Sequence, residues 1–105
     1  MSKNQLLYGI KAETWKKITG VLRSKPAVEK IILFGSRAKG NFRNGSDIDL
    51  CVKGSALTEK DLNSLIRELD ELDLPWEIDL LRYETISEPA VVDHIDRVGI
   101  CLYPG

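Results

Sequence analysis

The amino-acid sequence predicts an α/β (α+β) fold, a small mixed β-sheet covered by helices. Segments with helical spacing alternate along the chain with short strand-like segments, in the order α-β-α-β-α-β-α-β. Such alternation is typical of a sheet covered by helices. Two of the expected strands carry the acidic residues Asp47, Asp49 and Asp79. Strands buried on both faces of a doubly wound parallel sheet would not carry them, so a smaller mixed sheet is favoured.

The first half of the chain is expected to hold two helices and two strands. Apolar residues at helical spacing predict a helix over residues 10–23, and Pro26 ends it. A buried strand over residues 28–34 and a short helix over residues 36–39 follow. A loop rich in Gly and Asn over residues 40–45 then leads to an alternating strand over residues 46–53.

The third helix is predicted from its start and its apolar stripe. Thr58 and Asp61 have the spacing of a capping box, in which each side chain bonds the backbone N–H of the other residue. Pro75 ends the helix. Its inward face is expected to be formed by Leu62, Leu65, Ile66, Leu69 and Leu72.

The last part of the chain is expected to form a strand, a helix and a closing strand. Residues 76–82 alternate between apolar and acidic side chains, as in a strand with one buried face. Ser87 is expected to cap the last helix, with Pro89 in its first turn. A short strand over residues 99–103 then closes the fold.

Length and composition predict a single domain over residues 1–105, located in the cytoplasm. The chain is 43% hydrophobic and 30% charged, and its apolar runs are far shorter than the ~18 residues that span a bilayer. The polar segment 1–17 has no signal-peptide core, so no membrane association is expected. The formal net charge of −1 argues against direct nucleic-acid binding by charge alone.

Three residues with reactive side chains are assigned structural roles. Cys51 and Cys101 lie in apolar, strand-like contexts, where packed, reduced thiols are favoured over a disulfide or a metal pair. His94 has no His or Cys partner at metal-ligand spacing, so it is interpreted as a surface or half-buried histidine.

The segment GSRAKGNFRNGSDID, residues 35–49, is the strongest functional signal. Gly35 and Ser36 stand where a strand becomes a helix, and unpaired backbone N–H groups at such a point suit phosphate oxygens. Asp47 and Asp49 are two residues apart in an alternating strand, which places both carboxylates on one face. Two close carboxylates repel unless a cation lies between them, and Mg²⁺ prefers such ligands.

A third carboxylate and a set of cations extend this candidate site. Asp79 lies in another alternating strand, and if that strand neighbours the first, three carboxylates converge on one sheet face. Two-metal phosphoryl chemistry uses this arrangement, with a nucleoside triphosphate as the substrate. Arg37 and Arg43 fall in the intervening loop, and phosphate contacts are our hypothesis for both.

Gly-Ser, ten residues and then Asp-x-Asp resemble the signature of the DNA polymerase β-type nucleotidyltransferases. The wording around Gly35-Ser36 and Ser46-Asp47-Ile48-Asp49-Leu50 is similar to the minimal nucleotidyltransferase (MNT) family, over nearly the whole chain. Many members of that family are antitoxins of HEPN-domain ribonuclease toxins. The resemblance therefore implies a nucleotidyltransferase fold, like the palm of polymerase β, and a HEPN toxin as partner.

The resemblance also implies roles for individual residues. Gly35 and Ser36 would hold the β- and γ-phosphates of the nucleotide. Asp47 and Asp49 would bind both of two Mg²⁺ ions. Asp79 would bind the catalytic ion and help to deprotonate the acceptor hydroxyl. The implied reaction is transfer of AMP from ATP to a tyrosine hydroxyl of the toxin, with release of diphosphate.

Two other functions stay open at this point. The chain could be a non-catalytic binding module that neutralises its partner by occlusion. It could also be a small-molecule nucleotidyltransferase of the aminoglycoside-modifying kind, although those enzymes carry a further helical domain that holds the acceptor. This chain shows no such domain, so we expect another chain or a dimer mate to bring the acceptor, in a homo- or hetero-oligomer.

Overall fold

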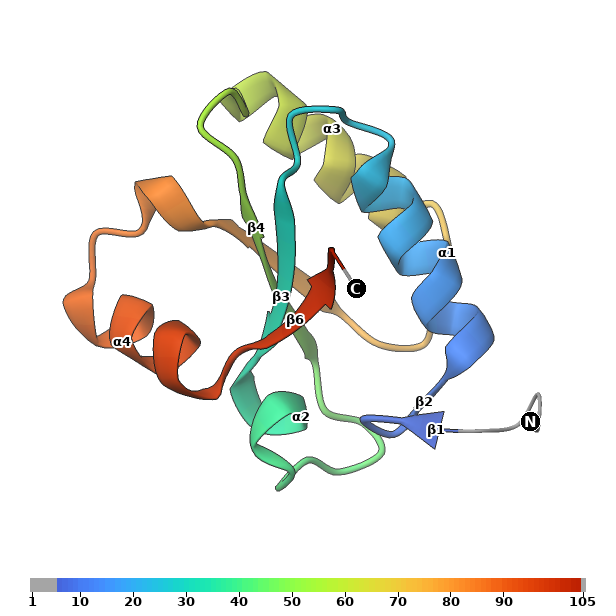
Figure 1. Ribbon diagram of the computed structural model, residues 1–105. Coiled ribbons are helices and arrows are strands. Elements are labelled where there is room, and N and C mark those ends of the chain that lie inside the picture. The colour runs from blue at the N-terminus through green and yellow to red at the C-terminus, as the bar shows by residue number, and fades with distance from the viewer. Residues whose placement is uncertain (1–5, 105) are drawn as a thin grey trace.

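The computed structural model describes residues 6–104 and confirms the predicted sheet covered by helices (Figure 1). From the first helix onward, helices and strands alternate in the predicted order. The elements are β1 (Leu6–Leu7), β2 (Ile10–Lys11), α1 (Ala12–Arg23), β3 (Lys30–Phe34), α2 (Gly35–Lys39), β4 (Ile48–Lys53), α3 (Glu59–Asp70), β5 (Ile78–Arg82), a 3-10 turn (Tyr83–Thr85), α4 (Pro89–Val98) and β6 (Ile100–Tyr103).

The main sheet is mixed, as the sequence predicts. Its strand order is β5-β4-β3-β6. Strand β3 runs antiparallel to both β4 and β6, whereas β4 and β5 are parallel. The two central strands, β3 and β4, therefore carry the segments on either side of the Gly-Ser to Asp-x-Asp loop. This topology brings the two ends of that motif together.

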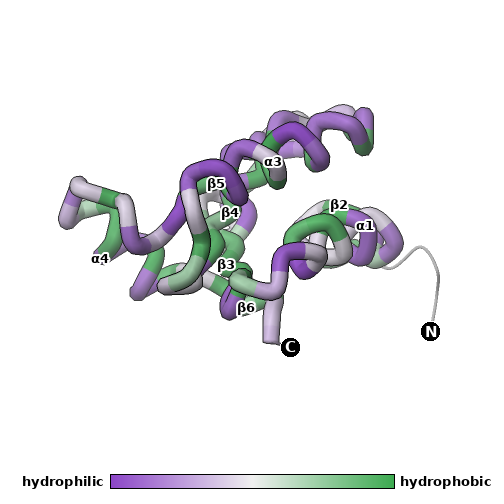
Figure 2. Tube along the Cα trace, turned by 90° about the horizontal axis from the view of Figure 1, so that it is seen from above, coloured by the Kyte–Doolittle hydropathy of each residue, from purple (hydrophilic) through white to green (hydrophobic). Residues whose placement is uncertain are grey.

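Helices cover the two faces of the sheet unequally. Helices α1 and α3 lie on one side of the sheet and α4 on the other (Figure 2). The strands alternate accordingly: in β4, Ile48, Leu50 and Val52 are fully buried in the core, while Asp49 lies on the opposite face. Helices α1 and α3 complete this core with Trp15, Ile18, Leu22, Leu62, Leu65 and Leu69.

The first turn of the predicted helix over residues 10–23 is instead part of a hairpin. Residues 10 and 11 form β2, which pairs antiparallel with β1, and the helix starts at residue 12. Tyr8 and Gly9 connect the strands with φ of 55° and 81°. Two consecutive positive φ values are typical of a type I′ hairpin turn. Since Tyr is not a usual residue at such a turn, the sequence carries little signal for it.

The helix caps agree with the sequence in one case and differ in another. Thr58 and Asp61 form the predicted capping box at the start of α3. The expected cap at Ser87 is wrong, because the N-cap of α4 is Glu88, without a side-chain cap bond. Pro89 is the first helical residue; its missing N–H needs no partner and its fixed φ suits a helix start.

The predicted inward stripe of α3 is correct except at Ile66, since Leu72, although partly exposed, also packs against the core. Leu62, Leu65 and Leu69 are buried, but 43% of Ile66 is exposed, and Leu72 lies beyond the helix end. Ile66 directly follows Leu65, so it is turned 100° away from that core residue around the helix axis. The sequence pattern alone does not show how narrow the buried stripe is.

The two cysteines differ in environment. Both thiols are free, Cys51 is buried as predicted, and Cys101 is exposed, which corrects the prediction that it is packed. Cys101 lies on β6, which is a strand at the edge of the sheet.

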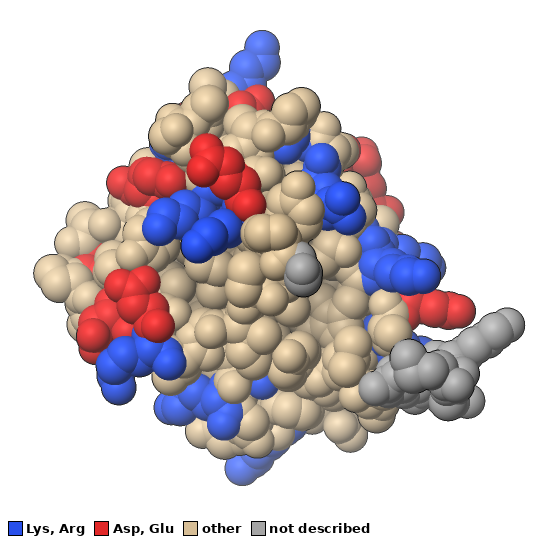
Figure 3. All heavy atoms as spheres, in the orientation of Figure 1, with Lys and Arg blue, Asp and Glu red and all other residues tan. Residues whose placement is uncertain are grey.

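The surface carries charges of both signs. On the face shown in Figure 3, Lys and Arg side chains are interspersed with Asp and Glu around a mostly uncharged centre. Within residues 6–104, no helix combines the length and the apolar character that a membrane span requires.

Candidate functional site

Gly35 forms the turn between β3 and α2 and adopts φ of +74°. A residue with a side chain rarely adopts this conformation, so glycine is required by the backbone alone. Space imposes the same requirement, because a Cβ at this position would collide with the Asp49 carboxylate. The turn backbone thus packs directly against one of the predicted metal-binding carboxylates.

Sheet register brings two of the predicted aspartates side by side. Asp49 of β4 is paired with Asp79 of the parallel strand β5 and, on its other side, with Phe34, the last residue of β3. Directly paired residues of neighbouring strands share a face of the sheet. Asp47 was expected inside the strand over residues 46–53, but it lies just before β4, which starts at Ile48. Asp49 and Asp79 therefore lie side by side, and Asp49 also neighbours the end of β3.

The charges of these aspartates act on one another. Burial raises the pKa of the Asp49 carboxyl, and the negative charges of Asp79 and Asp47 raise it further, while His94 lowers it. Asp49 is half-buried, whereas Asp47 and Asp79 are exposed. Within residues 6–104, none of the three carboxylates accepts a hydrogen bond or forms an ion pair. A cation between them would relieve this repulsion.

The predicted three-carboxylate cage is not closed in the structure. Across the described part of the chain, no group of three or more His, Cys, Asp and Glu side chains is gathered closely enough to hold a metal ion. Two features account for this: Asp47 precedes the strand that positions Asp49, and like charges separate unless a cation intervenes. The carboxylate oxygens nevertheless suit Mg²⁺, because proteins usually bind this ion through only one or two carboxylates.

Arg37 holds the loop instead of facing the phosphate position. Its side chain is 1% exposed, and its guanidinium donates to the carbonyl oxygens of Tyr8, Asn44 and Ser46, at 2.8, 3.3 and 2.8 Å. The guanidinium also lies 5.1 Å from the centre of the Phe42 ring. These contacts give Arg37 a structural role, and they do not support the phosphate contact predicted for it.

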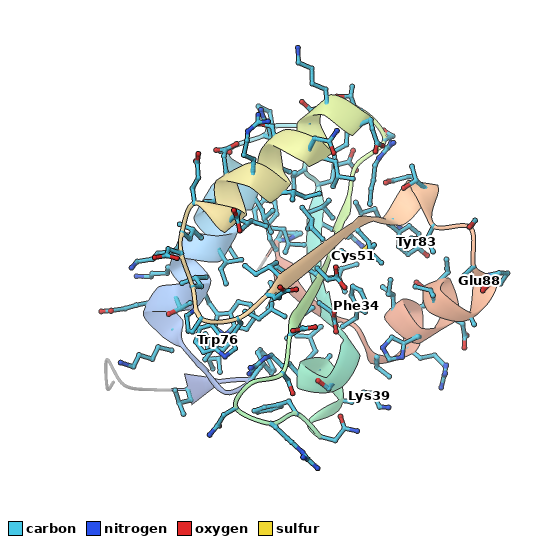
Figure 4. The ribbon with its side chains drawn as sticks, turned by 180° about the vertical axis from the view of Figure 1, so that it is seen from behind. Phe34, Lys39, Cys51, Trp76, Tyr83 and Glu88 are labelled. Atoms are coloured by element: carbon cyan, nitrogen blue, oxygen red, sulfur yellow. The ribbon has the colours of Figure 1, made fainter. Side chains whose placement is uncertain are left out.

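Trp76 fastens the same loop from the other side. Its indole N–H donates to the carbonyl oxygen of Asn44 at 2.9 Å, and its ring lies 5.7 Å from the Arg37 guanidinium. Figure 4 shows Trp76 where the chain leads into β5, well away from Lys39 at the end of α2. Trp76 therefore helps to hold the loop that contains Asn44.

Ser36 and Arg43 keep the positions that the phosphate prediction needs. Ser36 is half-buried in the first turn of α2, and Arg43 is exposed. The backbone N–H of Arg43 donates to the Ser46 hydroxyl at 2.8 Å, which shapes the loop and leaves the Arg43 side chain at the surface. Phosphate contacts by these residues stay predictions.

His94 is the residue of this site whose contact sequence analysis missed. It is half-buried, as expected, but its Nε2 accepts a hydrogen bond from the backbone N–H of Gly35 at 3.2 Å. The two residues are 59 positions apart. No motif spacing connects them, because the contact depends on how α4 packs on the sheet.

A glycine turn packed against paired aspartates, in a mixed sheet covered by helices, agrees with the polymerase β-type nucleotidyltransferase fold expected from the sequence. The family model for "Polymerase beta, Nucleotidyltransferase" matches residues 16–104. The chain therefore belongs to the polymerase β-type nucleotidyltransferase family, and the enzyme class predicted from the sequence is confirmed.

Individual relatives agree with this membership. The chain is 34% identical over 84 residues to the probable protein adenylyltransferase MntA of Haemophilus influenzae, covering 75% of this chain and 70% of the relative. It superimposes with a TM-score of 0.69 on a toxin-antitoxin crystal structure with AMP-PNP, at 27% identity, over 84% of this chain and 71% of the other.

A further solved structure supports the fold. It contains a tri-AMPylated HEPN toxin of Shewanella oneidensis in complex with an MNT antitoxin, and the TM-score is 0.62 at 24% identity. The match covers 84% of this chain and 67% of the other.

Proposed function

We propose that this chain transfers AMP from ATP to a tyrosine hydroxyl of a partner HEPN toxin and so acts as its antitoxin. The main support for this proposal is the contact between the Gly35 turn and Asp49, which is itself paired with Asp79. This contact joins a phosphate-binding element to acidic residues that suit a metal. The adenylyltransferase name of the Haemophilus relative and the AMP-PNP in a similar toxin-antitoxin structure support the nucleotide and the acceptor class.

Mg²⁺ fits the carboxylates of Asp47, Asp49 and Asp79, which would hold two ions. Within residues 6–104 these carboxylates have no hydrogen-bond or ion-pair partner, so their oxygens can bind a metal ion. Bound cations would offset the repulsion that contributes to the raised pKa of Asp49. Bound Mg²⁺ would neutralise charge on the triphosphate and lower the pKa of the attacking hydroxyl.

The protein's own residues would orient the nucleotide and accept a proton. The Gly35–Ser36 turn holds the β- and γ-phosphates through donors other than the Gly35 N–H, which already donates to His94, and Arg43 contacts the phosphates from the loop. The acceptor oxygen attacks the α-phosphorus as the bond from that phosphorus to the bridging oxygen breaks. Diphosphate leaves with the electron pair, and the hydroxyl proton passes to Asp79. Positioning and charge neutralisation supply most of the rate enhancement in such transfers.

The acceptor is a second protein. The carboxylates of Asp47 and Asp79 are exposed, so a residue of another chain can reach them. A cavity of about 510 Å³ lies between α3 and the segment leading into β5, but its lining includes none of the proposed catalytic residues. That arrangement favours a protein surface over a small molecule as the acceptor, in a hetero-oligomer with the toxin.

The proposal is tested by incubating the chain and its co-purifying toxin with ATP labelled on the α-phosphate, with and without Mg²⁺. We expect Mg²⁺-dependent label on a toxin tyrosine, located by mass spectrometry, and loss of toxin ribonuclease activity. ATP labelled on the γ-phosphate should leave the toxin unlabelled. Label from the γ-phosphate would indicate a kinase and would contradict AMP transfer.

The D47N/D49N double variant separates catalysis from occlusion. Both substitutions keep the side-chain shape and remove the charges that bind metal. We expect the double variant to bind the toxin but to leave it unlabelled and active. If it neutralised the toxin as well as the wild type does, the non-catalytic binding module would be the correct function.

A further inference from the structure

His94 makes a contact that the proposed reaction does not yet use. Its Nε2 accepts the hydrogen bond from the Gly35 N–H at 3.2 Å. Among residues 6–104, no other side chain accepts a hydrogen bond from the backbone of the Gly35–Ser36 turn. The position of this turn therefore depends on α4.

Packing holds the imidazole in place. The His94 ring meets the Phe34 ring edge-on, with ring centroids 6.1 Å apart and an interplanar angle of 79°, an arrangement that stabilises aromatic pairs. Phe34 ends β3 directly before the turn, as Figure 4 shows, and is paired in register with Asp49. The neighbouring residue Ile95 is buried and anchors α4. His94 thus contacts both residues at the junction of β3 and α2.

The same junction determines where the turn lies relative to the metal-binding residues. Gly35 adopts a left-handed conformation and packs against the Asp49 carboxylate. Because glycine adopts positive and negative φ about equally readily, contacts from its surroundings must select this conformation. The hydrogen bond from the Gly35 N–H to His94 of α4 is the side-chain contact that holds the turn in this conformation.

We propose that His94 is a positioning residue, which fixes the Gly35–Ser36 turn beside Asp49 so that the turn is already formed when the triphosphate binds. This inference deepens the proposed function and rests on it. A turn that is formed only part of the time binds its ligand more weakly, in proportion to the fraction of molecules in which it is formed. Removal of the hydrogen bond should therefore weaken nucleotide binding.

The test compares three variants of the full chain, with AMP-PNP and Mg²⁺ in calorimetry at pH 8. H94A removes the acceptor, whereas H94Q places an amide oxygen near the position of Nε2. D93A changes an exposed neighbour on α4 that pairs only with Arg97. We expect Kd to rise about tenfold in H94A and to stay within about threefold of wild type in H94Q and D93A. Circular dichroism checks that each variant is folded.

A second readout follows the turn itself. The Gly35 amide signal in ¹H–¹⁵N spectra without nucleotide should shift in H94A and return toward its original position in H94Q, while the Gly20 signal stays unchanged. Wild-type affinity in H94A, or equal weakening in H94A and H94Q, would overturn the positioning role. If the wild type bound no nucleotide, the proposed function would fail. The Gly35 signal would then decide the role of His94 alone, and an unchanged signal in H94A would refute it.

Discussion

The space that a side chain on Gly35 would need is occupied by the carboxylate of Asp49. Gly35 belongs to the turn after β3 and Asp49 to the neighbouring strand β4. Their contact joins the two ends of the sequence motif and explains why the motif begins with glycine. It also places any phosphate held by the turn next to the carboxylates.

The substitution G35A should abolish nucleotide binding and destabilise the fold. The new methyl group would face both the positive φ of +74° and the Asp49 carboxylate, at a combined cost of about 1–3 kcal/mol. Gly20 provides a matched control: it lies inside α1, and a Cβ there meets no atom within 4 Å. G20A should stabilise the protein by about 0.5–1 kcal/mol. Urea unfolding measures both effects, and equal effects at the two glycines would contradict this explanation.

Neutralising Asp49 should stabilise the metal-free protein. The pKa of this carboxyl is raised in the folded state, so the folded protein binds the proton more tightly than the unfolded chain does. Stability therefore falls as the pH rises from the unfolded pKa of about 3.9 through the higher folded value. Above the folded pKa the wild-type carboxyl is charged in both states, and D49N should then be more stable than wild type.

The pH dependence of this difference provides the check. The advantage of D49N should shrink toward zero near pH 3, because the wild-type carboxyl is then protonated in both states. Urea unfolding at pH 3 and pH 7, in buffer with EDTA, measures it. A D49N protein that was less stable than wild type at pH 7 would show that Asp49 stabilises the metal-free fold.

Arg37 and Arg43 should respond differently to substitution, although the sequence suggested one role for both. The ammonium of lysine cannot replace the planar guanidinium that joins three carbonyl oxygens. R37K should therefore lose about 2–4 kcal/mol of stability. R43A should change stability by less than about 0.5 kcal/mol but weaken nucleotide binding. Thermal unfolding and calorimetry together test this, and a stable R37K protein with weak binding would restore the phosphate role of Arg37.

Local patterns were enough to predict the elements that carry the motif. Alternation of apolar and acidic residues predicted β4 and β5. If these two strands were neighbours, Asp49 and Asp79 were expected to share one face of the sheet. Their pairing in register confirms this. The capping box at Thr58 was also predictable, since both of its residues lie in one stretch of four.

Contacts between distant segments were not predictable in this way. The burial of Arg37 depends on carbonyl groups of the hairpin and the loop, and its positive charge suggested a surface role instead. The bond from Gly35 to His94 depends on the packing of α4. In each case the side chain bonds to a backbone group. Every residue type has such a group, so the sequence does not indicate which one is the partner.

The two cysteines should differ sharply in reactivity. Cys51 is fully buried on β4, and burial, aided by the charge of Glu84, raises the pKa of its thiol to about 12. Only the thiolate reacts with disulfide reagents, so Cys51 should be inert at pH 8 in the folded protein. Cys101 is exposed and should react at once. Titration with Ellman's reagent should give one thiol in native buffer and two in guanidinium. C101S should remove the native reaction, and a rapidly reacting thiol in C101S would contradict the buried, protonated state of Cys51.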